Sequence, residues 1–292
     1  LTKAWRCGKH EFTDPAYDFH RTAYAILLAH GHGNDASALV QDLAAASVIA
    51  VDTETTSTDP LRADLVGISL AVREGQGYYI PVGHTTGEPQ LPLEQVIDAL
   101  RPALSDPTKG KVGQNLKYDV LSLRMVGLDV TPLSFDTMIA EWLSNPASRH
   151  LGLKDMADIY LDIQMIHIQE LIGRGKTQIT MERVPVEKVA PYAAADAEVV
   201  LRLMPILEKR LGEYNCKTLF EGLEMPLISV LAGMEYIGVA LDPNFFTKMS
   251  KEIGDRMLDL ETRIYETVGD KFNLNSPQQL SKVLFGTLHL TP

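Results

Sequence analysis

The sequence predicts an α/β fold, with a mixed sheet flanked by helices and followed by an α-helical segment. An apolar run at residues 48–56 and two shorter runs at 64–72 and 77–82 have the length and the turn-forming borders of strands. From Asp119 to Tyr214 the apolar residues recur with the spacing of helices, and helical patterns continue beyond. We therefore expect one sheet that is covered by helices.

The elements follow in chain order. A short helix comes first, with apolar side chains at Ala36, Leu39, Val40 and Leu43. The three strands are next, and a turn at residues 74–77 joins the second and third into a meander. The prediction continues with a short amphipathic helix at 93–100, an extended stretch at 111–116 and helices from 119 to 214.

The last part of the chain has the pattern of two long helices, at 219–236 and 245–268. Pro226 lies inside the first of them, where we expect a kink. We therefore divide the chain into a domain at 1–214, with an N-terminal extension to about residue 46, and a helical segment at 215–292.

Length and composition agree with a globular protein. A chain of 292 residues with 45% hydrophobic content can bury a full core. No apolar run in the sequence approaches the length of a membrane span, and Cys7 and Cys216 define no disulfide framework. We therefore expect a protein without a membrane partner in a reducing, cytoplasmic location.

Two carboxylates, Asp52 and Glu54, lie at the end of the first strand. Because side chains alternate along a strand with period two, both acids should point to the same face of the sheet. Oxygen ligands of this kind suit hard divalent cations, but a pair of such ions needs more ligands than two carboxylates supply. The pair therefore predicts part of a metal site.

Two later segments offer the missing oxygen ligands. In the first, Asn115-Leu116-Lys117-Tyr118-Asp119, an acid stands where an extended stretch changes to a helix. In the second, Tyr192-Ala193-Ala194-Ala195-Asp196, alanine-rich helix formers place Tyr192 and Asp196 four residues apart and so on one helical face. A phenol and a carboxylate would then point into the same space.

Together, these three segments resemble, in order, the three motifs of the DEDDy 3′-5′ exonucleases, and specifically the exonuclease domain of family A DNA polymerases. The resemblance covers residues 48–214 through the nuclease motifs, and residues 215–292 resemble the opening of the polymerase domain. It implies a ribonuclease-H-like fold. It also implies that the chain is a fragment without the palm and fingers of the polymerase.

The resemblance implies a two-metal hydrolysis of the 3′-terminal phosphodiester of single-stranded DNA, with Mg²⁺ or Mn²⁺ as the two ions. Asp52, Glu54 and Asp196 would hold one ion, Asp52 would bridge to a second ion near Asp119, and Tyr192 would orient the attacking water. The family pattern is broken at two positions. Ala195 replaces a frequent glutamate, and Thr58 stands where a leucine usually wedges against the terminal base.

A net charge of −11 means that basic residues must offset the acids locally wherever a nucleic acid binds. We expect substrate contacts from residues in and around the last two motifs, namely Asn115, Lys117, Tyr118, Arg174 and Lys176. Lys109, Lys111 and Arg183 extend these basic groups. The partners would be the 3′ end of single-stranded DNA and the remainder of the polymerase chain.

Two alternatives stay open at this point. An RNA-trimming exonuclease of the ribonuclease D type shares the three motifs, but would not be expected to have the polymerase-like segment after residue 214. A non-catalytic module that binds DNA or braces a polymerase would have the fold without turnover. The presence of all four acids and the tyrosine argues against this second alternative.

Overall fold

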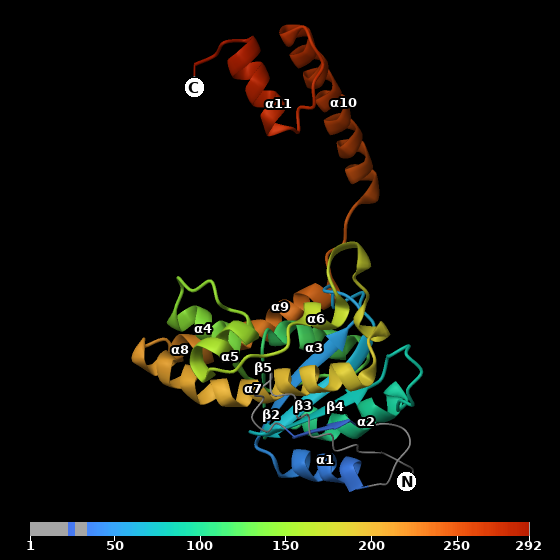
Figure 1. Ribbon diagram of the computed structural model, residues 1–292, viewed down its shortest axis with the longest axis vertical. Coiled ribbons are helices and arrows are strands. Elements are labelled where there is room, and N and C mark those ends of the chain that lie inside the picture. The colour runs from blue at the N-terminus through green and yellow to red at the C-terminus, as the bar shows by residue number, and fades with distance from the viewer. Residues whose placement is uncertain (1–22, 27–33, 292) are drawn as a thin grey trace. The chain divides into compact units, whose positions relative to one another are not determined.

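The computed structural model describes residues 23–26 and 34–291, and in this part of the chain six strands form one mixed sheet (Figure 1). The strands are β1 (Ala23–Ile26), β2 (Val48–Thr55), β3 (Leu65–Arg73), β4 (Gln76–Pro81), β5 (Gly110–Gly113) and β6 (Leu133–Asp136). Their order across the sheet is β1-β4-β3-β2-β5-β6. The central β2, β3 and β4 form the predicted antiparallel meander, whereas β1, β5 and β6 join in parallel.

The helices around the sheet in the first part of the chain are α1 (Asn34–Ala45), α2 (Leu93–Leu104), α3 (Leu116–Met125), α4 (Thr137–Ser144), α5 (Leu153–Leu161), α6 (Ile168–Ile172) and α7 (Val186–Glu213). Two 3₁₀ turns, η1 (Gly175–Thr177) and η2 (Met181–Arg183), precede α7. The long α7 packs across β2, β3 and β4. The α/β architecture that the sequence predicts is therefore confirmed.

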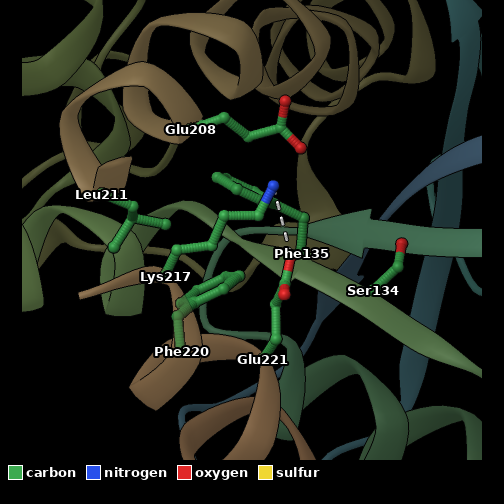
Figure 2. Close-up of a pocket in the computed structure, with 7 residues that line it drawn as sticks. All are labelled: Ser134, Phe135, Glu208, Leu211, Lys217, Phe220 and Glu221. Carbon is green, nitrogen blue, oxygen red and sulfur yellow. Dashed lines mark ion pairs between the residues drawn. The ribbon is translucent and has the colours of Figure 1, made fainter. Parts of the chain in front are cut away.

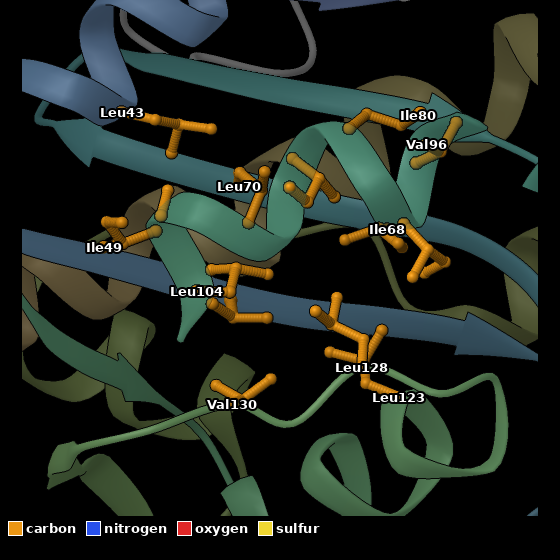
Figure 3. Close-up of a cluster of buried hydrophobic side chains, with 14 of the residues drawn as sticks. Leu43, Ile49, Ile68, Leu70, Ile80, Val96, Leu104, Leu123, Leu128 and Val130 are labelled. Atoms are coloured by element: carbon orange, nitrogen blue, oxygen red, sulfur yellow. The ribbon is translucent and has the colours of Figure 1, made fainter. Parts of the chain in front are cut away.

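Buried hydrophobic residues form clusters on both faces of the sheet, and β2 contributes to one on each face. Ile49 and Val51 belong to the core that also holds buried leucines of α1 and α2 (Figure 3). Ala50, which points the other way, belongs to the core that contains Val199 and Val200 of α7. Continued alternation turns the side chains of Asp52 and Glu54 toward α7, as the spacing predicts.

The helix α7 approaches β4 closely at one point, where Gly77 faces Ala194. A Cβ atom on Gly77 would lie 2.5 Å from the Ala194 carbonyl oxygen and 2.9 Å from its Cβ. Both distances are shorter than van der Waals contact, so a larger residue at position 77 would push α7 away from the sheet. The run of alanines in α7 thus has a packing role as well as a high helix propensity.

We expect Gly77→Ala to destabilise the fold by about 1–3 kcal/mol, because the added methyl group overpacks the contact between β4 and α7. Thermal unfolding followed by circular dichroism measures the change. Gly212→Ala is the matched control, since Gly212 lies in α7 with nothing within 4 Å of an added Cβ. This control should gain about 0.5 kcal/mol from helix propensity. Equal effects of the two substitutions would contradict the packing argument.

Two short strands, β1 and β6, were not predicted. Each has four residues, which is too short for an alternation pattern to stand out. The extended stretch predicted at 111–116 is also wrong at its end, because β5 ends at Gly113 and α3 begins at Leu116. The helix begins before the predicted Asp119 because the N–H group of Leu116 donates to the carboxylate of Asp136, which is 20 residues further along the chain.

The described chain divides into two compact units, of which the first ends at Ile237 and the second begins at Gly238. The first unit includes α8 (Lys217–Leu219), a π-helical turn η3 (Phe220–Glu224) and α9 (Met225–Ile237). The predicted kink position Pro226 is the second residue of α9, two residues after the end of this π-helical turn, and its missing backbone N–H accounts for the irregularity there. The predicted division at 214/215 into an exonuclease and a polymerase part stays a prediction.

The second unit consists of α10 (Pro243–Val268), α11 (Pro277–Ser281) and a π-helical turn η4 (Lys282–Thr287). Pro243 occupies the first position of α10, and the Asp242 side chain accepts hydrogen bonds from the first-turn N–H groups. Gly269 ends the helix with a left-handed conformation (φ 78°). Across residues 23–26 and 34–291, none of the helices is both long and apolar enough to span a membrane.

Candidate metal centre

Three of the four predicted metal ligands converge where β2 faces α7. One carboxylate oxygen from each of Asp52, Glu54 and Asp196 lies within 4.8 Å of the other two. Glu54 and Asp196 are buried, and Asp52 is half-buried. All the donor atoms of this cluster are oxygens, and such a cluster fits a hard divalent cation such as Mg²⁺ or Mn²⁺.

Tyr192 lies one turn before Asp196 on the same face of α7, as the four-residue spacing predicts. Tyr192 is only 7% exposed, and it lies close enough to the Asp196 carboxylate to influence its pKa. Burial raises the pKa of Tyr192 far above its usual value, and the nearby charges of Asp196 and Glu54 raise it further. The phenol therefore stays protonated at neutral pH and can act as a hydrogen-bonding group.

The fourth carboxylate, Asp119, stands beside this group on the first turn of α3. Thr53, which lies between the two acids of β2, donates a hydrogen bond of 2.6 Å from its hydroxyl to Asp119 Oδ1. The start of α3 is fixed by Asp136, whose carboxylate accepts the N–H groups of Asn115 (3.2 Å) and Leu116 (2.7 Å). Asp136 thus positions the second motif, a role that sequence reasoning missed.

All four carboxylates have raised pKa values, and the charges of their neighbours contribute to those of Asp52 and Glu54. For Asp52 burial has the largest effect, followed by the charges of Asp119, Glu54 and Asp196. Burial is also the main reason why the pKa of Glu54 lies well above its usual value and why that of Asp119 rises to about 7. The site without a bound cation is therefore electrostatically strained, and a cation would relieve this strain.

One cation from the chain itself already lies against the cluster. Lys154, on the first turn of α5, donates from Nζ to both carboxylate oxygens of Asp196, at 2.7 and 2.8 Å. The same Nζ lies 4.2 Å from the centre of the Tyr192 ring. Sequence reasoning did not single out Lys154, because one lysine on an amphipathic helix is ordinary and its partner Asp196 is 42 residues away.

The predicted substrate contacts are placed in different ways. Tyr118 lies near the cluster, and its hydroxyl hydrogen-bonds to Thr55 and to the Ser57 carbonyl. Asn115 is exposed at the start of α3 with a left-handed backbone (φ 57°). Lys117 forms an ion pair with Glu235 of α9, so this contact would have to open before Lys117 could bind a phosphate.

The remaining basic groups fall into two sets. Arg174 and Lys176 are exposed in and beside η1, where they are accessible to a ligand. Lys109 and Lys111 instead donate from Nζ to backbone carbonyls, those of Ala44 and Ala46 for Lys109 and those of Asp106 and Lys109 for Lys111. The expectation that these two lysines extend a phosphate-binding group is wrong, because both side chains support the fold.

A small pocket lies away from these carboxylates, between β6, the C-terminal part of α7 and the helical turn that follows (Figure 2). Phe135, Leu211 and Phe220 form its apolar part, and Lys217 pairs with Glu221 at its edge at 3.6 Å. Ser134 and Glu208 complete the lining. None of the residues predicted for the metal site or for substrate contacts lines this pocket.

The mixed sheet with flanking helices and the acidic cluster define an α/β protein with a candidate divalent-metal site, and comparison with known proteins gives the family. A family model described as 3′-5′ exonuclease, that of family A DNA polymerases, matches residues 33–212. The chain therefore belongs to the 3′-5′ exonuclease domain family of family A DNA polymerases, and is an enzyme of this type.

Two curated relatives and two solved structures illustrate the relationship. DNA polymerase I of Chloroflexus aurantiacus is 43% identical over 257 residues, which are 87% of this chain and 27% of the relative. DNA polymerase I of Pseudomonas aeruginosa is 39% identical over 259 residues, which are 87% of this chain and 28% of the relative. This chain thus spans little more than a quarter of the length of these relatives.

Among solved structures, the POL domain of Pol1 from M. smegmatis in complex with DNA primer-template and dNTP has a TM-score of 0.68 and 24% identity. The match covers 89% of this chain and 41% of that one. Brucella melitensis NrnC with bound Mg²⁺ has a TM-score of 0.50 and 22% identity, over 68% of this chain and 90% of that one. At these identities the two structures support the fold alone.

Proposed function

We propose that the chain removes nucleotides from the 3′ end of single-stranded DNA and serves as the proofreading part of a DNA polymerase I. The observation that carries this proposal is the convergence of Asp52, Glu54 and Asp196, with Tyr192 one turn before Asp196 on α7. The names of the curated relatives and the DNA complex among the solved structures support a DNA substrate and a polymerase as the parent chain.

The residues of the site have distinct roles in this proposal. Asp52, Glu54 and Asp196 hold one divalent ion, Mg²⁺ or Mn²⁺, and Asp52 together with Asp119 holds a second. Bound ions supply an activated water and stabilise the charge that develops on the leaving 3′ oxygen. Tyr192, protonated and on the same face of α7 as Asp196, orients the attacking water.

Contacts to the DNA come from a small number of residues. Tyr118 lies beside the cluster, where its hydroxyl donates to the Ser57 carbonyl, and Asn115 is exposed at the start of the same helix. Arg174 and Lys176 offer exposed positive charge to the backbone of the strand. A few nucleotides of single strand require no more than this, because base stacking on aromatic residues adds to phosphate binding. The cytoplasmic location stays a prediction.

The proposal is tested by incubating the purified chain with single-stranded DNA that is labelled at the 5′ or the 3′ end. The reactions contain Mg²⁺, Mn²⁺ or EDTA. Stepwise shortening of the 5′-labelled strand and immediate release of the 3′ label are expected, both dependent on metal. RNA of the same sequence distinguishes the ribonuclease D alternative. A folded chain that degrades neither nucleic acid with either metal would overturn the proposal in favour of a scaffold role.

A further inference from the structure

Lys154 is the basic group that most directly contacts the carboxylate cluster. Both oxygens of Asp196 accept hydrogen bonds from its Nζ, which also lies over the ring of Tyr192. The Lys154 side chain is 17% exposed and that of Asp196 10%, so the ion pair is largely shielded from water. Such a shielded pair is much less screened by solvent than a surface salt bridge.

The position of Nζ conflicts with the use of Asp196 as a metal ligand. The ammonium group occupies lone pairs on both carboxylate oxygens that a divalent ion would need. A second positive charge would also be repelled by Lys154 at this short range. An ion at Asp196 therefore competes with Lys154 for this carboxylate, and it gains full access when Lys154 turns away. Its position on the first turn of α5 and its partial exposure leave a path toward solvent.

We infer that Lys154 is a resident cation of the metal-free site, which a divalent ion displaces when it binds. This inference rests on the proposed metal site and adds a residue that sets its affinity. While the metal is absent, Lys154 compensates part of the repulsion among Asp52, Glu54 and Asp196 and holds the ring of Tyr192 in place. Metal loading is then the exchange of one cation for another, and Lys154 weakens the intrinsic affinity.

The first test is the affinity for Mn²⁺, measured by electron paramagnetic resonance without substrate. We expect Lys154→Met to lower the dissociation constant by roughly tenfold or more, because both the competitor and the repulsive charge are removed. Lys154→Arg keeps the charge and should bind Mn²⁺ about as weakly as the original chain. Circular dichroism confirms that each variant is folded.

Lys209→Met is the matched control for the loss of one positive charge. Lys209 lies on α7, 13 residues or about 20 Å beyond Asp196 along the helix, and its side chain is 78% exposed. This variant should leave the Mn²⁺ affinity unchanged. A similar gain in affinity for both methionine variants would mean that net charge alone is responsible, and would overturn the inference.

The second test needs no substitution. Brief acetylation of lysines, read out by mass spectrometry, should label Lys154 slowly in EDTA and several-fold faster with saturating Mg²⁺, relative to Lys209 in the same chain. If Mn²⁺ binds but the labelling of Lys154 does not change, or Lys154→Met gains no Mn²⁺ affinity, the inference is overturned and the proposed metal site stands. Absence of Mn²⁺ binding in all proteins would overturn the metal site as well.

Discussion

Replacing both Asp52 and Glu54 by alanine is expected to lower the rate of metal-dependent 3′ cleavage by a factor of roughly 10³ or more. Loss of two ligands removes metal-based stabilisation of several kcal/mol from the transition state, and each 1.4 kcal/mol corresponds to a factor of ten. The measurement is the single-turnover rate on 5′-labelled single-stranded DNA at saturating Mg²⁺. Both substitutions remove buried or half-buried charges that repel each other, so the fold should be retained.

Asp155→Ala with Asp158→Ala is the control pair for this experiment. Both carboxylates are exposed on α5, the helix that also carries Lys154, and the pair removes the same charge. The control should cleave at the original rate. If the Asp52 and Glu54 variant retained more than a tenth of the rate while folded, the chemistry would have to be assigned to other residues.

The sequence was sufficient for those parts of the site that depend on local periodicity. Asp52 and Glu54 share a face because a strand repeats every two residues, and Tyr192 and Asp196 share one because they are four residues apart on a helix. That β2 and α7 then meet is a tertiary contact, which only the resemblance to a family could anticipate. The fold class and the central meander were predictable for the same local reasons.

The contacts that local pattern could not predict are all long-range. Asp136 starts α3 from a position 20 residues away, and Lys154 reaches Asp196 across 42 residues. Lys111 looked like an exposed phosphate ligand in the sequence, yet its side chain is completely buried against backbone carbonyls. In each case a charged residue type is compatible with several environments, and only the fold selects one of them.

The pH dependence of stability in EDTA should reveal the strain of the metal-free cluster. Asp119 has a pKa of about 7 in the fold and near its usual 3.8 when unfolded, so its ionisation above pH 7 destabilises the fold. As the pH falls through 7, Asp119 becomes protonated in the folded chain, and the free energy of unfolding rises. Between pH 8.5 and 6.5 the gain from Asp119 alone is about 1 kcal/mol, or about 2–4 °C in melting temperature.

The Asp119→Asn variant lacks this titration, and with it the Asp119 charge that raises the pKa values of Asp52 and Glu54. Lys111, with its pKa lowered to about 8 by burial, opposes the gain in the same pH range, but equally in both proteins. His84, buried against Tyr79 and the Val184 carbonyl, has a lowered pKa and costs stability only as the pH falls below about 6.5. The stability of the original chain relative to Asp119→Asn should therefore rise by about 1 kcal/mol from pH 8.5 to 6.5.

Tryptophan fluorescence provides the measurement, since Trp142 lies on α4, which packs against α7 of the first unit. Trp5→Phe in both proteins leaves Trp142 as the single tryptophan of the chain. Saturating Mg²⁺ should abolish or reverse the pH effect, because a bound ion favours the ionised carboxylates. Parallel pH profiles of the two proteins in EDTA would show that Asp119 is already ionised near its usual pKa, and that the cluster is not strained in the way its burial indicates.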